Sequence, residues 1–463
     1  MRVMSGLDAR FLFSETPAAH MHTLKVAVVD VSGRTEELTP ELLLAAIGTR
    51  LERMPVLRHR VVPVPHGLGN PVVIDDPDFD LGRHLRVETL PGPGGTRELD
   101  RVIAEIASVP LPRDRPLWEL TAVAGLADGQ IGFVAKIHHA LADGTAAVAL
   151  LNNLFIAEDG DAVVEPFRPE PLPSRRSLYG SAAREAARAM RSVPGFVGRT
   201  VAGLRGVRAV RRHHEVPVLG PFAGPRTPFN VSITPDRTFA SFALPIADMN
   251  AARIGTDASL NDVFLAVCAG GIRRYLDRTG ELPTTSLVAS VPVATLTEQH
   301  RLGGNHVDNM FLPLHTDLAD GIERVRAVHA STAAARRDRL ALGTELFEPR
   351  AGLVPPVLYA ATMRSWASTG LADHVRPPLN LVASGVRGPR ELLELDGGVI
   401  TALYSSGPIL EGIGLNITAW SYVDTMYVSV LGCSRSLPDP HQLADDVVAE
   451  LSEISGRAGS VGL

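Results

Sequence analysis

The chain has 463 residues, more than a single hydrophobic core usually supports, so two domains are expected. Hydrophobic residues make up 45% and charged residues 21% of the sequence, a globular composition that excludes a disordered chain. The formal net charge of −6 is too small to suggest a nucleic-acid partner.

The N-terminal residues 1–13 lack the apolar core and the small-residue cleavage site of a secretory signal peptide. No stretch reaches the roughly 18–20 uninterrupted apolar residues that a spanning helix needs. The two cysteines, Cys268 and Cys433, each lie in an apolar run, which excludes a disulfide framework and fits a reducing compartment. We therefore expect a cytoplasmic protein, either free or bound peripherally to a membrane.

Strands and helices alternate in the first part of the chain. In residues 98–111, apolar side chains recur at helical spacing, while 118–124 and 130–137 are consecutive strand candidates around a turn. The other predicted elements here are a strand at 24–31, a helix near 39–53, short strands in RHRVVPV and NPVVIDDP, and a helix in TAAVALLNNLF.

The composition changes between about 159 and 230. Residues 174–214 carry ten arginines against one glutamate, and prolines crowd both flanks. We interpret this segment as a linker with a solvated basic helix; the alternative is a surface that meets anionic lipid headgroups or a phosphorylated substrate. The predicted division is an N-terminal domain at 1–165, a basic linker at 166–235 and a C-terminal domain at 236–463.

The last part of the chain is again mixed. Helices are predicted at 259–276, 318–340 and 440–456, and strands in FASFALP, SLVASVPV, NMFLPL, LNLVASGV, VITALYSS, GLNITAWSY and TMYVSVLG. Because strands alternate with helices in both halves, each half is expected to be an α/β or α+β layer structure with a mixed sheet.

The segment IHHALADG, residues 137–144, holds the most prominent candidate chemistry. Successive side chains of a strand point to opposite faces, so His138 and His139 should lie in different environments, one in the domain interior and one facing open space. Asp143-Gly144 is typical of a turn, and a helix is expected to follow.

Three interpretations of this segment remain open from the residues alone. A metal site is disfavoured because the ligands of a metal must converge, whereas adjacent strand histidines diverge. A structural histidine pair at a strand end is the plain alternative. A general base is the third, since a neutral imidazole can take a proton from a hydroxyl or amine near neutral pH, with Gly144 leaving room for a substrate.

HHALADG also matches HHxxxDG, the signature of the acyl-CoA-dependent acyltransferase superfamily. The flanking sequence resembles, from residue 5 to about 450, the bacterial bifunctional wax ester synthase/diacylglycerol acyltransferase family. The matching segments are SGLDARFLFSETPAAHMHTL, FDLGRHLRVETLPGPGGTRELD, RPLWEL, SLNDVFLAVCAGGIRRYL, VASVPV, GGNHVDNMFLPL and GPILEGIGLNITAWSYVDTMYVSV.

The resemblance implies two chloramphenicol-acetyltransferase-like domains with an active-site tunnel at their interface. It implies transfer of an acyl group from acyl-CoA, as co-substrate, to diacylglycerol or a long-chain alcohol, without a metal or other cofactor. A membrane or lipid-droplet surface is a further expected partner, and no nucleic acid is expected.

The resemblance also assigns residues. His139 would be the general base, His138 would orient it, and Asp143 would be structural, paired with an arginine for which Arg58 and Arg60 are candidates. Asn261 and Asp262 match an ND element that lies near the site. The Asn261 side chain or a backbone amide would stabilise the oxyanion.

One segment departs from the family pattern. The usual NVPGP appears here as GVRGP, residues 385–389, so an asparagine and a proline are replaced and Arg387 enters. We interpret this as a tolerated loop change; the alternative is altered contact with the acceptor or CoA. Two other functions therefore stay open: acylation of a non-glycerolipid acceptor, or binding of acyl-CoA or lipid droplets without turnover.

Overall fold

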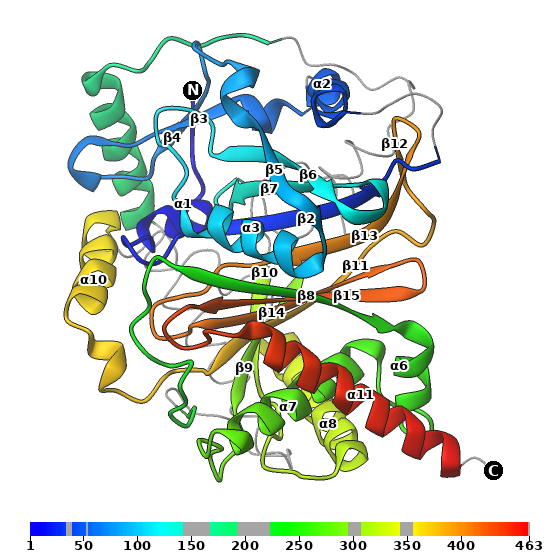
Figure 1. The fold of residues 1–463 in the computed structure, drawn as a ribbon. Helices are drawn as coiled ribbons and strands as arrows, with labels where there is room; N and C mark the ends of the chain where they lie inside the picture. Colours follow the sequence, from blue (N-terminus) through cyan, green and yellow to red (C-terminus); the bar gives the residue numbers. More distant parts are fainter. Residues whose placement is uncertain are drawn as a thin grey trace.

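The computed structural model describes residues 1–33, 39–51, 54–141, 167–191, 223–294, 307–342 and 355–461. In these ranges, the chain forms two six-stranded sheets and one small three-stranded sheet. Figure 1 shows the two large sheets in the middle of the molecule, with the helices outside them. This confirms the predicted mixed sheets flanked by helices.

The first sheet has the order β12-β13-β2-β7-β6-β5. The strands β2 (His22–Asp30), β7 (Gln130–His138) and β6 (Trp118–Leu126) are antiparallel neighbours, and β5 (Leu85–Gly94) is parallel to β6. The remaining elements of this half are α1 (Gly6–Phe13), α2 (Pro40–Leu51), α3 (Thr96–Ser108), and a sheet of β1 (Arg2–Val3), β4 (Val72–Asp75) and β3 (His59–Val62).

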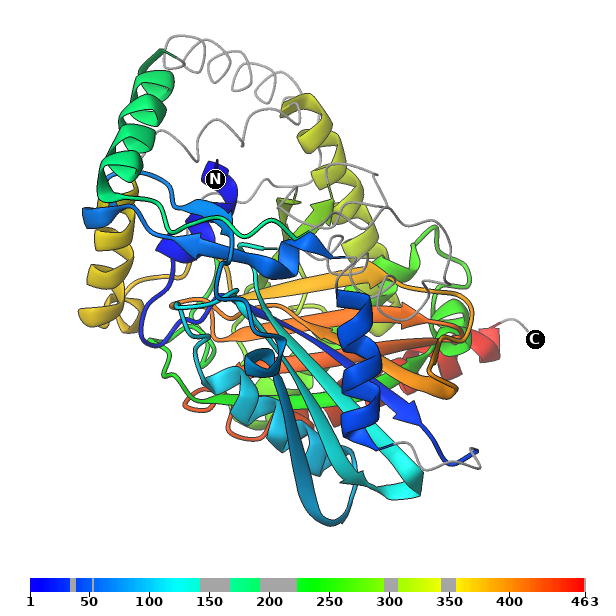
Figure 2. The ribbon, with the colours of Figure 1, turned by 90° about the horizontal axis from the view of Figure 1, so that it is seen from above.

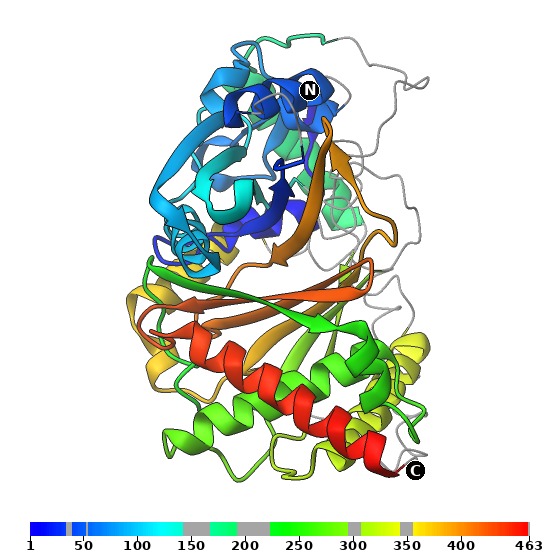
Figure 3. The same ribbon diagram turned by 45° about the vertical axis from the view of Figure 1, so that its right-hand side comes forward.

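The second sheet has the order β10-β9-β11-β14-β15-β8. Its strands are β8 (Arg237–Pro245), β9 (Val288–Ala294), β10 (Val307–Pro313), β11 (Leu381–Arg387), β14 (Leu415–Tyr422) and β15 (Thr425–Cys433). Its helices are α6 (Ile246–Ala252), α7 (Leu260–Arg278), α8 (Gly321–Leu342) and α11 (Pro440–Val461). Figure 3 shows α7, α8 and α11 on the face of this sheet that is turned away from the first half.

Close packing of α7 on α11 explains a pair of glycines in the middle of a helix. A Cβ at Gly271 would lie 2.4 Å from Val447 Cγ2, and one at Gly270 would lie 2.3 Å from the carboxyl carbon of Glu450. A side chain at either position would push the helices apart. Each glycine destabilises the isolated helix by about 1 kcal/mol relative to alanine, but it allows α7 and α11 to pack closely.

A segment of the second half joins the sheet of the first half, which the sequence did not predict. The strands β12 (Glu394–Leu395) and β13 (Gly398–Ser406) come from the expected C-terminal domain, yet β13 pairs with β2 and completes the first sheet. The proposed boundary near 165 lies outside the described residues. A single cut at 235 does not separate the sheets, because β13 crosses to the other half.

The halves are joined by shared cores and by a buried polar contact. One core combines Ala27 and Ile137 of the first sheet with Trp420 of the second, while another lies wholly between the second sheet and its helices. The Asp100 carboxylate of α3 accepts hydrogen bonds from the Ser241 hydroxyl at 2.6 Å and from the His441 ring at 3.0 Å. Both partners belong to the second half, so this contact fixes α3 against it.

No helix in the described part of the chain is both long enough and apolar enough to cross a bilayer. The helix expected in TAAVALLNNLF lies outside the described residues. The strand expected in LNLVASGV is β11, and it continues one residue into the segment interpreted as a loop, pairing with β14 up to Arg387.

Candidate active site

The two histidines stand at the end of β7, held by backbone hydrogen bonds. The His138 amide donates to the Leu117 carbonyl at 2.9 Å, and the His139 amide donates to the Met21 carbonyl at 2.8 Å. The chain then turns, with the Leu141 amide donating to the His138 carbonyl at 2.9 Å. Strand β7 ends at His138 and His139 begins the turn, and the two rings lie in different environments as predicted: His138 is fully buried and His139 is half-buried.

The His138 ring is held in one tautomer. Its Nδ1 accepts a hydrogen bond from the Ala140 amide at 3.0 Å, so the proton must lie on Nε2, which donates to Glu15 Oε1 at 2.9 Å. Burial, together with the nearby charges of Arg113 and His139, holds the pKa of His138 well below its usual value. His138 is therefore neutral, fixed and buried away from solvent.

Glu15 links this ring to a third group. Its carboxylate forms an ion pair with Arg113, which lies in the segment just before RPLWEL. The Glu15 side chain is 17% exposed, so it is largely enclosed between the histidine and the arginine. Arg113, Glu15 and His138 therefore form a chain of contacts that ends at the backbone carrying His139.

The His139 ring lies flat against Phe11 of α1. The ring centroids are 4.0 Å apart and the planes differ by 9°. A stacked contact of this kind restricts rotation of the imidazole. The half-buried His139 is thus oriented by an apolar wall, which suits a group that must present one nitrogen to a reacting hydroxyl.

Asp143 and Gly144 lie outside the described residues, so the expected pairing of Asp143 stays a prediction. Of the two candidate partners, Arg60 contacts Asp76 Oδ1 at 3.4 Å and Asp78 Oδ2 at 3.8 Å. Arg58 is buried, with its guanidinium 5.2 Å from the centre of the Phe167 ring.

Asn261 and Asp262 occupy the N-terminus of α7. Asp262 is fully buried, forms a capping box with Ser259, and accepts hydrogen bonds from the His329 ring at 3.0 Å and the Thr332 hydroxyl at 2.7 Å. Burial alone would raise the pKa of Asp262, but these hydrogen bonds outweigh it and lower the pKa. Among the described residues, no hydrogen bond joins Asn261 or Asp262 to either motif histidine. The geometry shows Asp262 tying α7 to α8.

The departure at 385–389 faces Asn261. A Cβ at position 385 would lie 2.3 Å from Asn261 Oδ1, so a side chain there requires the Asn261 amide to move. Gly388, which the family pattern retains, is equally enclosed, since a Cβ there would lie 2.3 Å from the Ser421 carbonyl oxygen. Gly385 is therefore matched to the position of Asn261.

This contact yields a test. Gly385→Asn is expected to lower the free energy of unfolding by about 1–3 kcal/mol, because the new side chain overlaps Asn261 and must displace it. The measurement is a urea unfolding midpoint. Gly33→Asn serves as a control, since a Cβ at Gly33 meets no atom within 4 Å. In the double variant with Asn261→Gly, most of the loss should be recovered; equal losses in single and double variants would contradict the contact.

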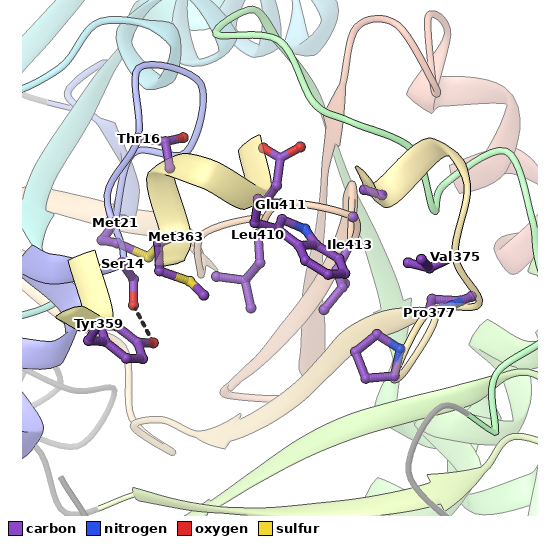
Figure 4. Close-up of a pocket in the computed structure, with 14 residues that line it drawn as sticks. Ser14, Thr16, Met21, Tyr359, Met363, Val375, Pro377, Leu410, Glu411 and Ile413 are labelled. Atoms are coloured by element: carbon purple, nitrogen blue, oxygen red, sulfur yellow. Dashed lines mark hydrogen bonds between the residues drawn. The ribbon is translucent and has the colours of Figure 1, made fainter. Parts of the chain in front are cut away.

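An apolar cavity of about 290 Å³ is connected to the motif through Met21 (Figure 4). Met21, whose carbonyl holds the His139 amide, lines it, and Ser14 and Thr16 line it on either side of Glu15 in the sequence. Its other walls come from α10 (Pro356–Ser368), from the segment that follows α10, and from the turn before β14. These lining residues are Tyr359, Met363, Trp366, Ala372, Val375, Pro377, Pro378, Leu410, Glu411, Gly412 and Ile413.

The cavity thus lies between parts of both halves. Its one hydrogen bond among the side chains drawn in Figure 4 joins the hydroxyls of Ser14 and Tyr359 at 3.0 Å. Burial raises the pKa of Glu411, whose carboxylate lies on the wall of the cavity. The remaining walls are almost entirely apolar, so the cavity suits a hydrocarbon chain.

Sequence reasoning missed the residues that surround the motif. Phe11 and Glu15 stand in the N-terminal segment that resembles the family, but nothing in their spacing indicates that they meet a histidine more than 120 residues away. Arg113 precedes RPLWEL, where arginine and aspartate alternate as in many exposed turns. Within the described residues, no group of three or more His, Cys, Asp and Glu side chains is arranged to hold a metal ion.

Comparison with known proteins shows which family the sequence matches. The family model described as "Wax ester synthase/diacylglycerol acyltransferase catalytic domain" matches residues 4–264, and "WS/DGAT C-terminal domain" matches residues 303–455. A Mycobacterium tuberculosis H37Rv protein named "Putative diacyglycerol O-acyltransferase" is 38% identical over 459 residues, covering 99% of this chain and 97% of its own. Another protein of that strain with the same description is 32% identical over 471 residues, covering 99% and 98%.

Solved structures show the same fold. The wax ester synthase/diacylglycerol acyltransferase from Marinobacter aquaeolei VT8 superposes with a TM-score of 0.67 at 24% identity, covering 99% of this chain and all of its own. The first condensation domain of the calcium-dependent antibiotic synthetase superposes with a TM-score of 0.58 at 17% identity, covering 98% and 96%. The two-domain architecture expected from HHxxxDG is thereby confirmed.

Proposed function

The chain belongs to the wax ester synthase/diacylglycerol acyltransferase family and is an acyltransferase; from that premise we propose that it moves the acyl group of acyl-CoA to the hydroxyl of diacylglycerol or of a long-chain alcohol. The proposed base is His139. The observation that carries the proposal is an apolar cavity whose wall includes Met21, the residue that holds the His139 backbone.

In the proposed mechanism, His139 removes the proton from the acceptor hydroxyl as its oxygen attacks the thioester carbonyl. A C–O bond forms and the carbonyl becomes a tetrahedral oxyanion. The oxyanion then collapses, the C–S bond breaks, and the CoA thiolate takes the proton back from the imidazolium. The transfer is direct and balanced, so it requires no resident metal or cofactor.

The neighbours of His139 support this role by position. Phe11 holds the ring plane, while Arg113, Glu15 and His138 hold the strand end from which His139 projects. A general base gains most when its nitrogen is already aligned with the proton that it removes. These contacts therefore suit a base whose ring plane and backbone are both fixed.

The cavity supports a long-chain acceptor or acyl group. Burying each methylene of a chain in an apolar site contributes about 0.8 kcal/mol, so even a partly enclosed chain gains substantial binding energy. A small polar acceptor would gain nothing from walls such as Met363, Trp366 and Ile413. The cavity thus supports a substrate with a long hydrocarbon chain, either the acceptor or the acyl-CoA.

The test supplies palmitoyl-CoA with either diacylglycerol or hexadecanol and follows release of free CoA with a thiol reagent. Release with at least one of these acceptors is expected. No release with either would overturn the proposal and favour a family member that binds acyl-CoA without turnover. Release with small polar acceptors alone would instead favour the non-glycerolipid alternative.

A variant that fills the cavity tests whether the cavity holds the acceptor chain. Met363→Trp places a larger side chain in the cavity and is expected to lower kcat/KM for hexadecanol by about 10-fold or more, in the range that pocket shape can discriminate. Butanol, which is too short to need the cavity, should be turned over at the original rate. An equal loss with both alcohols would mean that the cavity does not hold the acceptor chain.

A further inference from the structure

The region around residues 65–70 brings two helices to one face of the molecule. Ala182, on the helix spanning 175–191, lies against Gly69, and Val357 of α10 lies against Gly67. Figures 1 and 2 show both helices at the same edge, the one at 175–191 in green and α10 in yellow. They therefore share one exposed surface, with the 65–70 turn between them.

The helix at 175–191 is anchored on one side only. Leu178 and Ala182 are buried in a small core with Val64 and Val72. Its one acidic residue, Glu185, turns inward and accepts a hydrogen bond from the Asn70 amide at 3.0 Å. The sides away from the core carry no negative charge.

On the outward sides, an apolar stripe runs beside arginines. Tyr179, Ala183, Ala186 and Met190 are spaced by four, three and four residues, which places them in line along a helix, and all four are exposed. Met190 is 69% exposed. The arginines of this helix are all exposed, at positions 175, 176, 184, 188 and 191.

Neighbouring elements extend the apolar stripe. Leu68 of the turn is 54% exposed, and Leu358 of α10 is 58% exposed next to Val357. The helix α10 contains no acidic residue, and its only charged side chain is Arg364, which is exposed. Exposed apolar side chains from three elements thus lie on one surface with six arginines and no outward carboxylate on either helix.

We propose that this surface, formed by the helix at 175–191, the 65–70 turn and the outer side of α10, docks the enzyme on an anionic phospholipid bilayer. Arginines beside exposed Tyr, Met and Leu side chains are the pattern by which interfacial helices bind such membranes. The apolar side chains enter the headgroup region while the guanidinium groups meet the phosphates. This is the lipid-headgroup alternative that the basic segment raised; its remaining residues, 192–222, lie outside the described ranges.

The position of α10 indicates why the surface serves the reaction. Its inner side places Tyr359, Met363 and Trp366 in the wall of the chain cavity, while the adjacent Leu358 points outward. A lipid leaving the bilayer next to α10 would therefore need only to pass this helix to reach the cavity. The inference rests on the proposed function for this last step, whereas membrane binding itself is measured without turnover.

The test is flotation with vesicles of phosphatidylcholine containing 30% phosphatidylglycerol, compared with pure phosphatidylcholine, in the absence of acyl-CoA. The wild-type protein should float with the anionic vesicles and much less with the neutral ones. The triple variant Arg184→Gln, Arg188→Gln, Arg191→Gln should bind about 100-fold more weakly, since each such charge near an anionic surface contributes about 1 kcal/mol. Leu358→Glu with Met190→Glu should also abolish flotation.

The charge-matched control replaces Arg326, Arg336 and Arg337, all exposed on α8 at the far side of the second sheet, by glutamine. Its flotation should equal that of the wild type. The docking surface would be overturned if the triple arginine variant, or the double variant of Leu358 and Met190, floated like the wild type. An equal loss of flotation in the control variant would overturn it too.

Turnover separates this inference from the proposed function. The docking variants should lose activity on vesicle-borne diacylglycerol but keep the rate of palmitoyl transfer to butanol. If flotation follows the prediction but the protein shows no turnover, the proposed function is wrong and the docking surface is supported. If the variants turn over vesicle-borne diacylglycerol at the wild-type rate, the docking surface is wrong and the proposed function is supported.

Discussion

His139→Ala is expected to lower kcat/KM for palmitoyl-CoA and the preferred acceptor by roughly 10²–10⁴, the range typical for loss of a general base. The variant removes the imidazole that faces Phe11 and leaves the His139 backbone hydrogen bond to Met21 in place. The strand end and the cavity should therefore survive, and the loss should appear in the chemical step. The measurement is CoA release under single-turnover conditions.

Two controls make this result specific. The urea unfolding midpoint of His139→Ala should stay close to that of the wild type, because the ring is only half-buried and the backbone hydrogen bond is kept. Binding of palmitoyl-CoA, measured by fluorescence or calorimetry, should also persist. A variant that retains the wild-type rate would mean that another group removes the proton.

Glu15→Gln is expected to reduce kcat by about 10²-fold, the cost of displacing a catalytic group by roughly 1 Å. Glutamine nearly matches glutamate in size but cannot form the ion pair with Arg113, so the contact that holds His138 is weakened. Because the residue positions the base and does not touch the acceptor, the KM for palmitoyl-CoA should change little. Steady-state kinetics separates kcat from KM.

The pH dependence distinguishes positioning from simple loss of structure. Removing the Glu15 charge leaves the positive charge of Arg113 beside the histidines, which disfavours a charged imidazole and should move the acid limb of the kcat/KM profile to lower pH. Arg113→Gln removes the opposite charge and should move that limb to higher pH. If both variants lower the unfolding midpoint and leave the shape of the profile unchanged, Glu15 is merely structural.

Several features of the protein could be predicted from the sequence because they depend on local periodicity. The alternation of a strand predicts different environments for His138 and His139, and His138 is buried whereas His139 is half-buried. Helical spacing located α3, α7 and α11, and alternation or apolar runs located most strands of both sheets. The matches around HHALADG extended this to the family and the fold, since they run along almost the whole chain.

The residues that surround the motif could be identified only from the folded structure. Glu15 and Arg113 meet at His138 because the N-terminal segment and the segment before β6 converge on the end of β7, and no local pattern encodes that meeting. The same holds for β13, whose sequence reads as an ordinary strand but whose partner lies about 370 residues earlier in the chain. The overlap between position 385 and Asn261 likewise appears only when β11 and α7 are packed together.

The sequence by itself therefore determined the chemistry that the site can offer, a histidine at a strand end in a lipid acyltransferase family. Only the tertiary structure decided which groups orient that histidine and where a chain can lie. The physical reason is that secondary-structure patterns reflect neighbours a few residues apart. The ion pair at Glu15 and the cavity formed by the segment after α1, by α10 and by the turn before β14 arise from contacts between distant segments, and their geometry is set by packing.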